Sequence, residues 1–441
     1  MTSLSLDQLA RWQPPAGRPD PIEVLEQQER RRLSWLLPER HRRMARSAFA
    51  FYRGTPAVMA VDLGRAAHSG LEVQLCGDAH LGNFGFYASP ERSLLFDLND
   101  FDETVRGPFE WDLKRLISSL VIAARDINLS PEVQATVARH GARAYRRSMR
   151  KLAEESQLEV WYRRSDVDSL IRKLPDRPFR DHVIQVADQA RHRDSRQAVR
   201  KLCEAGPDGQ LRIRHDPPLI WRHAQMPPEA GIPQPLGERQ QHTYEEYLQS
   251  LRPHLRRLLS GFRLVDSASK AVGVGSVGTR CSIGLFLGEG PEDVLVLQSK
   301  QAEPSVLAAY ATSPPPSHQG QRVVEGQWLM QTVSDPFLGW TTNAHHEHLF
   351  WRHFRDWKGA IQLEQLDEEG LNLYGRLCAA TLAKAHARSG DRKALSQFMA
   401  GRKDFDRAIS DYAVAYADQS ARDYDTFLAA VASGRLSTPP G

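Results

Sequence analysis

The chain has 441 residues, and its 58 lysine and arginine residues nearly balance 54 aspartate and glutamate residues, so the formal charge at pH 7 is only +4. Binding of nucleic acid through bulk positive charge is therefore not indicated. Hydrophobic residues make up 41% and charged residues 25% of the chain, as in ordinary globular proteins. The most apolar stretch, near 116–124, is far shorter than the ~20 residues that span a bilayer, so we expect no membrane partner.

Cysteine usage indicates a reducing compartment. The four cysteines lie far apart and form no C-x-x-C pair, which argues against a disulfide framework and against a zinc knuckle. Because Asp7 and Arg11 precede any apolar core, we expect no signal peptide and a cytoplasmic protein. The basic residues are 48 arginines and only 10 lysines. A lysine in an apolar setting therefore needs an explanation, since arginine does not easily replace a compact charge on a flexible stem.

The first third of the chain combines short elements with long helices. Residues 1–45 are polar and rich in arginine, and they predict a helical lead-in. Aliphatic runs separated by glycines predict strands or other short elements at Ala57–Leu63, Leu71–Leu75 and Leu94–Leu98. Apolar residues at helical spacing predict one helix over 111–125 and a second that begins at Ser130-Pro131. 

The rest of the chain changes from helices to strands and back. Residues 213–238 hold six prolines and predict an irregular connection, and a helix is expected near 244–260. Short strands, a helix, a further strand and a last helix are then predicted, in this order: Val265–Val272, Cys281–Leu287, Val294–Gln298, Val323–Thr332, Leu349–Phe354 and Tyr374–Ala387.

Two loops in the first third hold most of the polar residues that suggest chemistry. One reads C-G-D-A-H-L-G-N and contains Asp78 and Asn83; the other reads N-D-F-D-E and contains Asp100 and Asp102. An aspartate followed five residues later by an asparagine can place a carboxylate near a substrate hydroxyl while the amide oxygen binds a metal ion. We therefore predict Asp78 as a catalytic residue and Asn83, Asp100 and Asp102 as ligands of Mg²⁺, which prefers oxygen ligands. The alternative is that these side chains only cap turns.

A glycine-rich segment, V-G-V-G-S-V-G-T, begins at Val272. A dinucleotide-binding fingerprint needs a helix directly after the third glycine, but the run at 281–287 indicates a strand. A glycine-rich hairpin that covers the phosphates of ATP is the better interpretation. The residues expected to contact the nucleotide are Gly273, Gly275, Ser276 and Gly278.

Lys300 follows the apolar run that ends the third predicted strand of this region. In kinases a lysine at this place contacts the α- and β-phosphates, and a glutamate in the next helix holds it. We therefore predict Lys300 as a phosphate-binding residue and Glu325 as its partner, with Glu303 as the competitor. The alternative is a lysine that reaches solvent from a sheet edge.

These motifs resemble those of kinase-like phosphotransferases, especially the aminoglycoside and choline kinase branch, which has H-G-D-x-x-x-x-N followed by I-D. Here Cys76 stands in place of the histidine, and G-P-F-E-W-D-L around Asp112 resembles the further aspartate of that branch. The order differs, because the catalytic and metal loops come first and the glycine segment comes last. L-A-K-A-H-A at 382–387 resembles the helix end that precedes the catalytic loop in that branch. The resemblance implies an α+β, bilobal protein-kinase-like fold that is circularly permuted, with a small β-rich lobe and a large helical lobe.

Five parts follow from this interpretation. They are a helical lead-in (1–45), the catalytic and metal loops of the large lobe (46–130), a helical insertion or acceptor-side region (131–260), a small β-rich nucleotide lobe (261–365) and the C-terminal helices of the large lobe (366–441).

Nearly the full chain also resembles the uncharacterised bacterial family known as domain of unknown function 2252. The matching strings are long and specific: F-Y-R-G from Phe51, C-G-D-A-H-L-G-N-F-G from Cys76, N-D-F-D-E-T from Asn99, G-P-F-E-W-D-L-K-R-L from Gly107, V-G-V-G-S-V-G-T-R-C from Val272 and A-H-A-R-S-G-D from Ala385. This family implies no known substrate.

The preferred function is an ATP- and Mg²⁺-dependent phosphotransferase that acts on a hydroxyl group of a small-molecule or protein acceptor. A catalytically weak or inactive nucleotide-binding module of the same shape is the alternative. A metallophosphoesterase is less well supported, because that class needs a separate D-x-H upstream of the first loop and a later G-H-x-H, and neither occurs.

Overall fold

The computed structural model describes residues 4–175, 178–225, 236–271, 277–290, 292–400 and 404–439, with the side chains of 236–240 excepted. Helices account for 52% and strands for 15% of the residues, which confirms a mixed α+β protein. Among the described residues, no helix is both long enough and apolar enough to cross a membrane.

The largest sheet has six antiparallel strands in the order β11-β12-β10-β9-β8-β7. Their bounds are Ile220–Arg222 (β7), Arg263–Lys270 (β8), Cys281–Leu287 (β9), Val294–Gln301 (β10), Gly339–Thr342 (β11) and His348–His353 (β12). The central three strands match the three predicted strands to within three residues at each end. Both faces of β10 are covered, so nearly all of its residues are buried.

Alternation along β10 places its residues on two different faces. Leu295 and Leu297 pack with tyrosines of α12 (Leu236–Ser250), which lies beside α13 (Pro253–Leu259). Val296, on the other face, packs with residues of α11 (Ser195–Leu202). Gln298 and Lys300 share the face of Val296 and therefore lie on the side of the sheet away from α12.

Long helices form the second part of the molecule. The bounds of these helices are Phe109–Asp126 (α6), Pro131–Glu154 (α7), Glu368–Ser389 (α15), Arg392–Ala400 (α16) and Phe405–Ala432 (α17). Helix α7 begins where Ser130-Pro131 predicts, with the Ser130 hydroxyl accepting a hydrogen bond from the backbone of Val133. Two glycines allow the helices to approach closely: a Cβ on Gly141 of α7 would lie 2.8 Å from Ile117, and one on Gly375 of α15 would lie 2.5 Å from Leu120.

Short elements connect and cover these two parts. The short helices are Leu6–Ala10 (α1), Pro21–Glu29 (α2), Leu37–Met44 (α3), Ala48–Gly54 (α4), Pro56–Gly64 (α5), Gln157–Tyr162 (α8), Val167–Lys173 (α9), Pro178–Arg191 (α10) and Gln319–Met330 (α14). The two-stranded sheets pair β1 (Glu72–Leu75) with β4 (Val105–Pro108), β2 (Phe84–Ala88) with β3 (Leu94–Leu98), and β5 (Cys203–Ala205) with β6 (Leu211–Ile213).

One run for which we expected a strand or another short element is a short helix. The run at 57–63 lies in α5, so the strand alternative is wrong at this place. Pro56 occupies the first turn of this helix, where its missing N–H costs nothing. A short apolar run that is buried nearly all round has no period by which strand and helix can be told apart.

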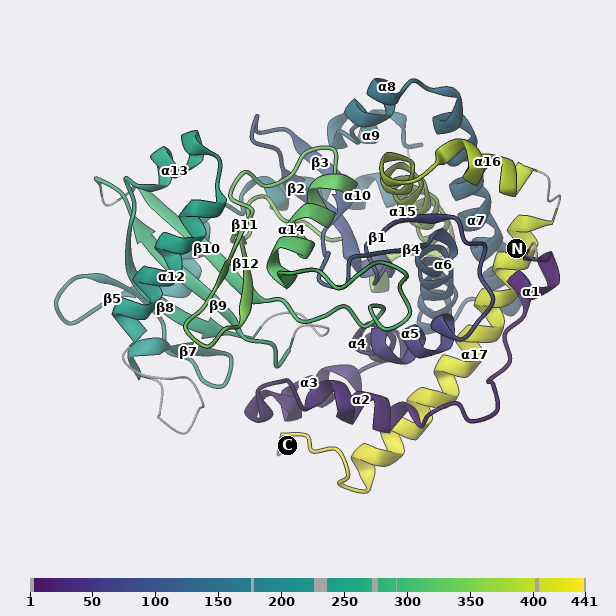
Figure 1. The fold of residues 1–441 in the computed structure, drawn as a ribbon, viewed down its shortest axis with the longest axis horizontal. Helices are drawn as coiled ribbons and strands as arrows, with labels where there is room; N and C mark the ends of the chain where they lie inside the picture. The colour runs from purple at the N-terminus through teal and green to yellow at the C-terminus, as the bar shows by residue number, and fades with distance from the viewer. Residues whose placement is uncertain are drawn as a thin grey trace.

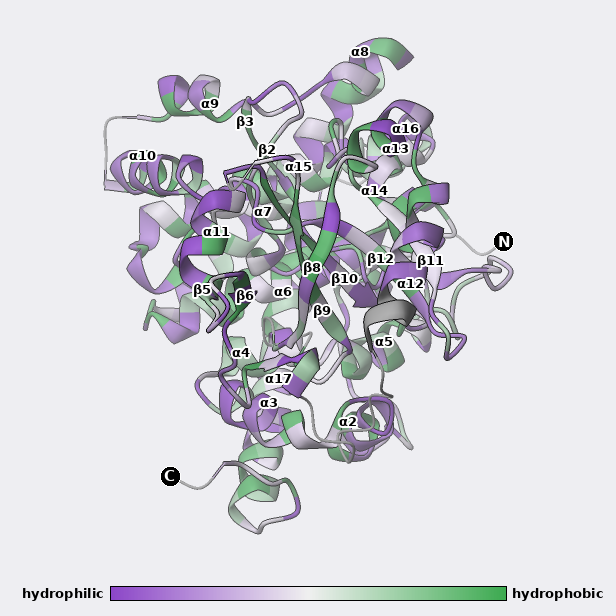
Figure 2. Ribbon diagram, turned by 90° about the vertical axis from the view of Figure 1, so that its left-hand side faces the viewer, coloured by the Kyte–Doolittle hydropathy of each residue, from purple (hydrophilic) through white to green (hydrophobic). Residues whose placement is uncertain are grey.

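Figure 1 shows how the parts are arranged, with the six-stranded sheet and α12 at one end and the long helices α6, α7, α15 and α17 at the other. Between them lie α14 and the strands β1 to β4. In Figure 2, helices α2 and α3 are largely purple and lie at the edge of the molecule. Because β1 to β4 lie between the sheet and the long helices in Figure 1, the loops that follow β1 and β3 lie there as well.

Candidate active site

Both acidic loops meet in the middle of the molecule. The backbone N–H of Asn99, at the start of the second loop, donates a hydrogen bond of 2.8 Å to the carbonyl of Asn83, at the end of the first. A small cavity of about 30 Å³ lies between them, lined by Arg32, Pro56, Cys76, Asp78, Asn83, Asp100, Asp102 and Glu103. This volume suits a metal ion or one or two water molecules. All four residues predicted for acid–base and metal chemistry therefore line one cavity.

Asp78 is held by an arginine that the sequence did not reveal. Arg115, on α6, donates from Nε to Asp78 Oδ1 at 2.9 Å, and its guanidinium lies 3.8 Å from the centre of the Tyr52 ring. Burial raises the pKa of Asp78 to about 6, and the charge of Arg115 opposes that rise. Asp78 is therefore a carboxylate that is ionised at neutral pH but close to the pKa of an effective general base.

A hydrogen bond within the first loop fixes the orientation of the Asn83 amide. Its Nδ2 donates a hydrogen bond of 2.7 Å to the backbone carbonyl of Asp78. No described group donates a hydrogen bond to its Oδ1, so this oxygen remains available as a ligand. The position of Asn83 is thus set by the same loop that carries the candidate base.

Asp100 and Asp102 bring two carboxylates to the other wall of the cavity. Asp102 contacts the ammonium of Lys300, and its Oδ1 is buried without a hydrogen-bond partner among the described residues. Burial and the neighbouring Asp100 raise the pKa of Asp102, whereas Lys300 lowers the pKa of Asp100 against the effect of burial.

The oxygen atoms at this wall fit a magnesium ion. One amide oxygen and two carboxylates are the hard ligands that Mg²⁺ selects, and the unpaired Oδ1 of Asp102 is a buried atom that lacks a partner. Within the described ranges, no group of three or more histidine, cysteine, aspartate or glutamate side chains is arranged to hold a metal ion. A magnesium site here would therefore need Asn83 and the oxygens of a bound phosphate in addition to the aspartates.

The expected pair between Lys300 and Glu325 is wrong. Lys300 contacts Asp102, while Glu325 is exposed on α14 and accepts a hydrogen bond of 2.7 Å from Gln321. Glu303, the competitor, accepts from Gln301 at 2.7 Å and lies 3.5 Å from Arg31. The lysine thus reaches the acidic loop itself instead of a glutamate on the next helix.

Arg322 is the residue of α14 that faces the site. Its guanidinium donates to the backbone carbonyls of Asp102 and Glu303, each at 2.8 Å, and also to the carbonyl of Thr104. One side chain therefore ties α14, the second acidic loop and the end of β10 together. With 48 arginines in the sequence, no local pattern distinguishes this one.

The predicted glycine segment is described only in part. Gly273, Gly275 and Ser276 lie outside the described residues. Gly278 has a φ of +91°, which favours glycine, and its carbonyl accepts a hydrogen bond of 2.7 Å from Leu33. Its neighbour Val277 accepts from Arg32, which lines the acidic cavity.

A buried network supports the first loop from behind. The carboxylate of Asp112 accepts hydrogen bonds from the backbone of Cys76 at 2.8 Å and of Gly77 at 3.0 Å, and His386 lies 3.3 Å away on α15. Tyr145 in turn lies 2.8 Å from His386. Two residues that the resemblance singled out, Asp112 and the histidine of L-A-K-A-H-A, are therefore brought together beneath the candidate base.

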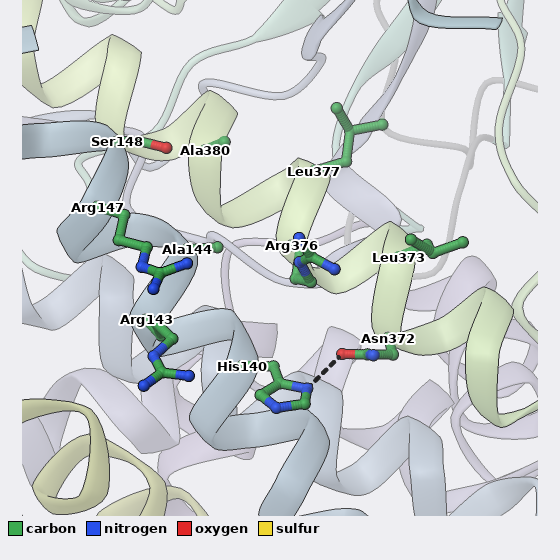
Figure 3. Close-up of a pocket in the computed structure, with 10 residues that line it drawn as sticks. All are labelled: His140, Arg143, Ala144, Arg147, Ser148, Asn372, Leu373, Arg376, Leu377 and Ala380. Atoms are coloured by element: carbon green, nitrogen blue, oxygen red, sulfur yellow. Dashed lines mark hydrogen bonds between the residues drawn. The ribbon is translucent and has the colours of Figure 1, made fainter. Parts of the chain in front are cut away.

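A larger hollow lies elsewhere, between α7 and α15 (Figure 3). It has a volume of about 500 Å³ and is lined by His140, Arg143, Ala144, Arg147, Ser148, Asn372, Leu373, Arg376, Leu377 and Ala380. His140 and Asn372 meet across it at 3.0 Å. None of the predicted site residues that the structure describes lines this hollow, so its size alone does not make it the candidate site.

Comparison with families of related proteins identifies one match, which covers residues 32–430 and is described as an uncharacterised protein conserved in bacteria, domain of unknown function 2252. Comparison with curated proteins and with solved structures finds no match. Because the family covers most of the chain and both loops of the site, the chain belongs to this bacterial family.

Proposed function

We propose that the protein is a kinase-like phosphotransferase that uses ATP and Mg²⁺ to phosphorylate a hydroxyl group. The observation that carries the proposal is the contact between Lys300 and Asp102, which are 198 residues apart in sequence. It joins a phosphate-binding type of lysine to a cavity lined by a candidate base and by oxygen ligands for magnesium. Phosphoryl transfer needs these parts in one place, since its catalysis consists mainly of positioning and charge neutralisation.

A circularly permuted kinase-like chain is supported by the meeting of two distant segments. The hydroxyl of Ser389, at the end of α15, accepts a hydrogen bond of 3.1 Å from the backbone of Gln74 in β1. In the kinases that the motifs resemble, the helix that ends in L-A-x-x-H-A leads directly into the catalytic loop. Here the same helix end lies beside the strand that leads into the loop, although the two are far apart in sequence.

Each residue then has a defined role. Asp78 accepts the proton of the acceptor hydroxyl, and Arg115 fixes its orientation. Asn83, Asp100 and Asp102 would hold Mg²⁺, which would neutralise the charge of the phosphates. Lys300 exchanges its contact with Asp102 for the donor phosphate. Catalysis thus depends on groups from the sheet, the two loops and α6 together.

The proposal is tested by titrating the full chain with ATP in the presence and absence of Mg²⁺ and by following ADP release. We expect Mg²⁺-dependent binding that Asp100→Asn weakens and turnover that Asp78→Asn abolishes, while Lys393→Met, at an exposed position of α16, leaves both unchanged. Absence of binding at millimolar ATP would contradict the proposal.

A nucleotide-binding module without transfer activity is the second candidate. The ion pair between Arg115 and Asp78 favours it, because a carboxylate oxygen held at 2.9 Å by a guanidinium is a weaker base. This candidate predicts ATP binding with no transfer, or ATP consumption that Asp78→Asn does not change.

A further inference from the structure

A pocket of about 360 Å³ lies on the face of the sheet that carries Lys300. Gln298 lines it and stands two residues before Lys300 on β10, so the two side chains point to the same side. Arg352, directly opposite Gln298 on β12, donates to it at 2.7 Å. The pocket therefore lies on the same side of the sheet as the lysine that contacts the second acidic loop.

The lining of this pocket is unusually cationic. Of the eight described residues that line it, five are basic and none is acidic: Arg43, Lys270, Ala271, Gln298, Arg352, Phe354, Arg355 and Lys358. Among the described residues, the ammonium groups of Lys270 and Lys358 have no hydrogen-bond or ion-pair partner, and Arg355 only lies near the Phe354 ring, at 5.2 Å. Three cationic side chains that no described carboxylate neutralises, Lys270, Arg355 and Lys358, therefore line one pocket.

The positive charges that line this pocket repel one another and so destabilise the folded state. Burial, with Arg352 acting in the same direction, lowers the pKa of Lys358 to about 7. Burial also lowers the pKa of Lys270, with Arg355 acting in the same direction. An anion in the pocket would offset both effects, and clustered charges that destabilise a protein are typical of binding sites.

The chemistry of the lining selects phosphate groups over a nucleobase. A base needs apolar walls, and among the described lining residues only Ala271 and Phe354 provide them. Guanidinium forks and ammonium groups match phosphate oxygens. Arg352 and Lys358 also line the neighbouring cavity of about 40 Å³ that contains Asn99, the residue directly before Asp100. The cationic pocket therefore continues toward the acidic loop.

We propose that this pocket binds the polyphosphate chain of the phosphoryl donor, with Arg352 and Lys358 holding phosphates beside Asp100. The inference deepens the proposed function and rests on it for the identity of the transferred group. In this arrangement the pocket recognises the donor by its phosphates and not by a nucleobase. Both a nucleoside triphosphate and an inorganic polyphosphate carry the phosphate chain that the pocket would bind.

Calorimetric titration of the full chain with tripolyphosphate, ATP and adenosine, in EDTA, tests the binding and distinguishes these two sources. We expect tripolyphosphate to bind, and adenosine not to bind. ATP that binds no more tightly than tripolyphosphate means that the phosphates alone are recognised, and ATP that binds more tightly means a nucleotide donor with its phosphates in the pocket. Binding of adenosine without binding of tripolyphosphate would overturn the inference.

Lys358→Met and Arg355→Gln locate the site. Each should weaken tripolyphosphate binding by about tenfold, the value of one charge-assisted contact. Arg376→Gln, in the basic hollow of Figure 3, is the matched control and should keep full affinity. Lys358→Met removes a half-buried cation that has no ion-pair partner among the described residues, so its melting temperature should not fall. If the two variants and the control lose the same affinity for tripolyphosphate, binding depends only on the overall positive charge of the protein, and the inference is overturned.

The two proposals fail separately. Tripolyphosphate binding without any transfer from ATP would contradict the phosphotransferase and leave the pocket intact. Transfer from ATP without tripolyphosphate binding would contradict the pocket and leave the phosphotransferase intact.

Discussion

The imidazole of His386 on α15 lies 3.3 Å from the Asp112 carboxylate on α6, and both side chains are buried. The same carboxylate accepts two backbone hydrogen bonds from the loop of Asp78. Three segments that are distant in sequence therefore share one acceptor. The geometry of the candidate base depends on this buried contact.

Asp112→Ala should destabilise the protein by about 2–4 kcal/mol, because it leaves one buried and one partly buried N–H group unpaired. Asp411→Ala, at an exposed position of α17, is the control and should change stability by less than about 0.5 kcal/mol. Urea unfolding measures both. A loss for Asp112→Ala as small as that of the control would mean that the loop finds other acceptors.

Lys384 and Asp97 form a buried ion pair at 2.5 Å, between α15 and β3. Lys384→Met leaves the carboxylate buried and alone, so we expect a loss of about 3–5 kcal/mol in the free energy of unfolding. Combining it with Asp97→Leu removes the stranded charge and should restore part of that loss.

Lys393→Met is the control for the lysine change, since Lys393 is exposed. If the double variant is less stable than Lys384→Met alone, the pair is not isolated from its surroundings in the way that the structure indicates.

Arg322→Met should loosen the second acidic loop, because three carbonyl groups lose their donor. We expect weaker Mg²⁺-dependent ATP binding, by about tenfold, together with lower thermal stability. Glu325→Gln lies on the same helix and should change neither quantity. A loss of ATP binding in Glu325→Gln as large as that in Arg322→Met would restore the partner that the sequence suggested.

Lys114 should make stability rise with pH in the alkaline range. Burial lowers its pKa from 10.5 to about 8, and its ammonium lies 4.0 Å from the centre of the Tyr412 ring. Between these two values the unfolded chain binds a proton that the folded chain does not, so raising the pH favours the folded state. Lys114→Met lacks this gain, which amounts to about 3 kcal/mol at most.

The measurement compares the free energy of unfolding of wild type and Lys114→Met at pH 7.5 and at pH 10. The difference should move in favour of wild type at the higher pH, while Lys151→Met, which is exposed on α7, should show a constant difference. A pH-independent difference for Lys114→Met would mean that the ammonium is solvated.

Local pattern was sufficient for much of the architecture. The start of α7 follows from Ser130-Pro131, and the central strands follow from short apolar runs between glycines, because capping and alternation depend on neighbours in sequence. The two acidic loops could also be predicted, since Asp78 and Asn83 are only five residues apart. The secondary structure of the run at 57–63 could not be predicted, because an apolar segment that is buried nearly all round shows no hydrophobic period.

Partners across the fold were decided by tertiary structure alone. Glu325 stands three residues after Arg322, about 4.5 Å further along the helix axis, and only the packing of α14 against the acidic loop determines which of them faces the site. Arg115 and Lys358 likewise look like any other basic residue until α6 and the segment after β12 bring them to Asp78 and Asp100. A sequence specifies which chemical groups are present and which local turns and helices form. The distance between two groups that are far apart in sequence depends on the packing of all the elements that lie between them.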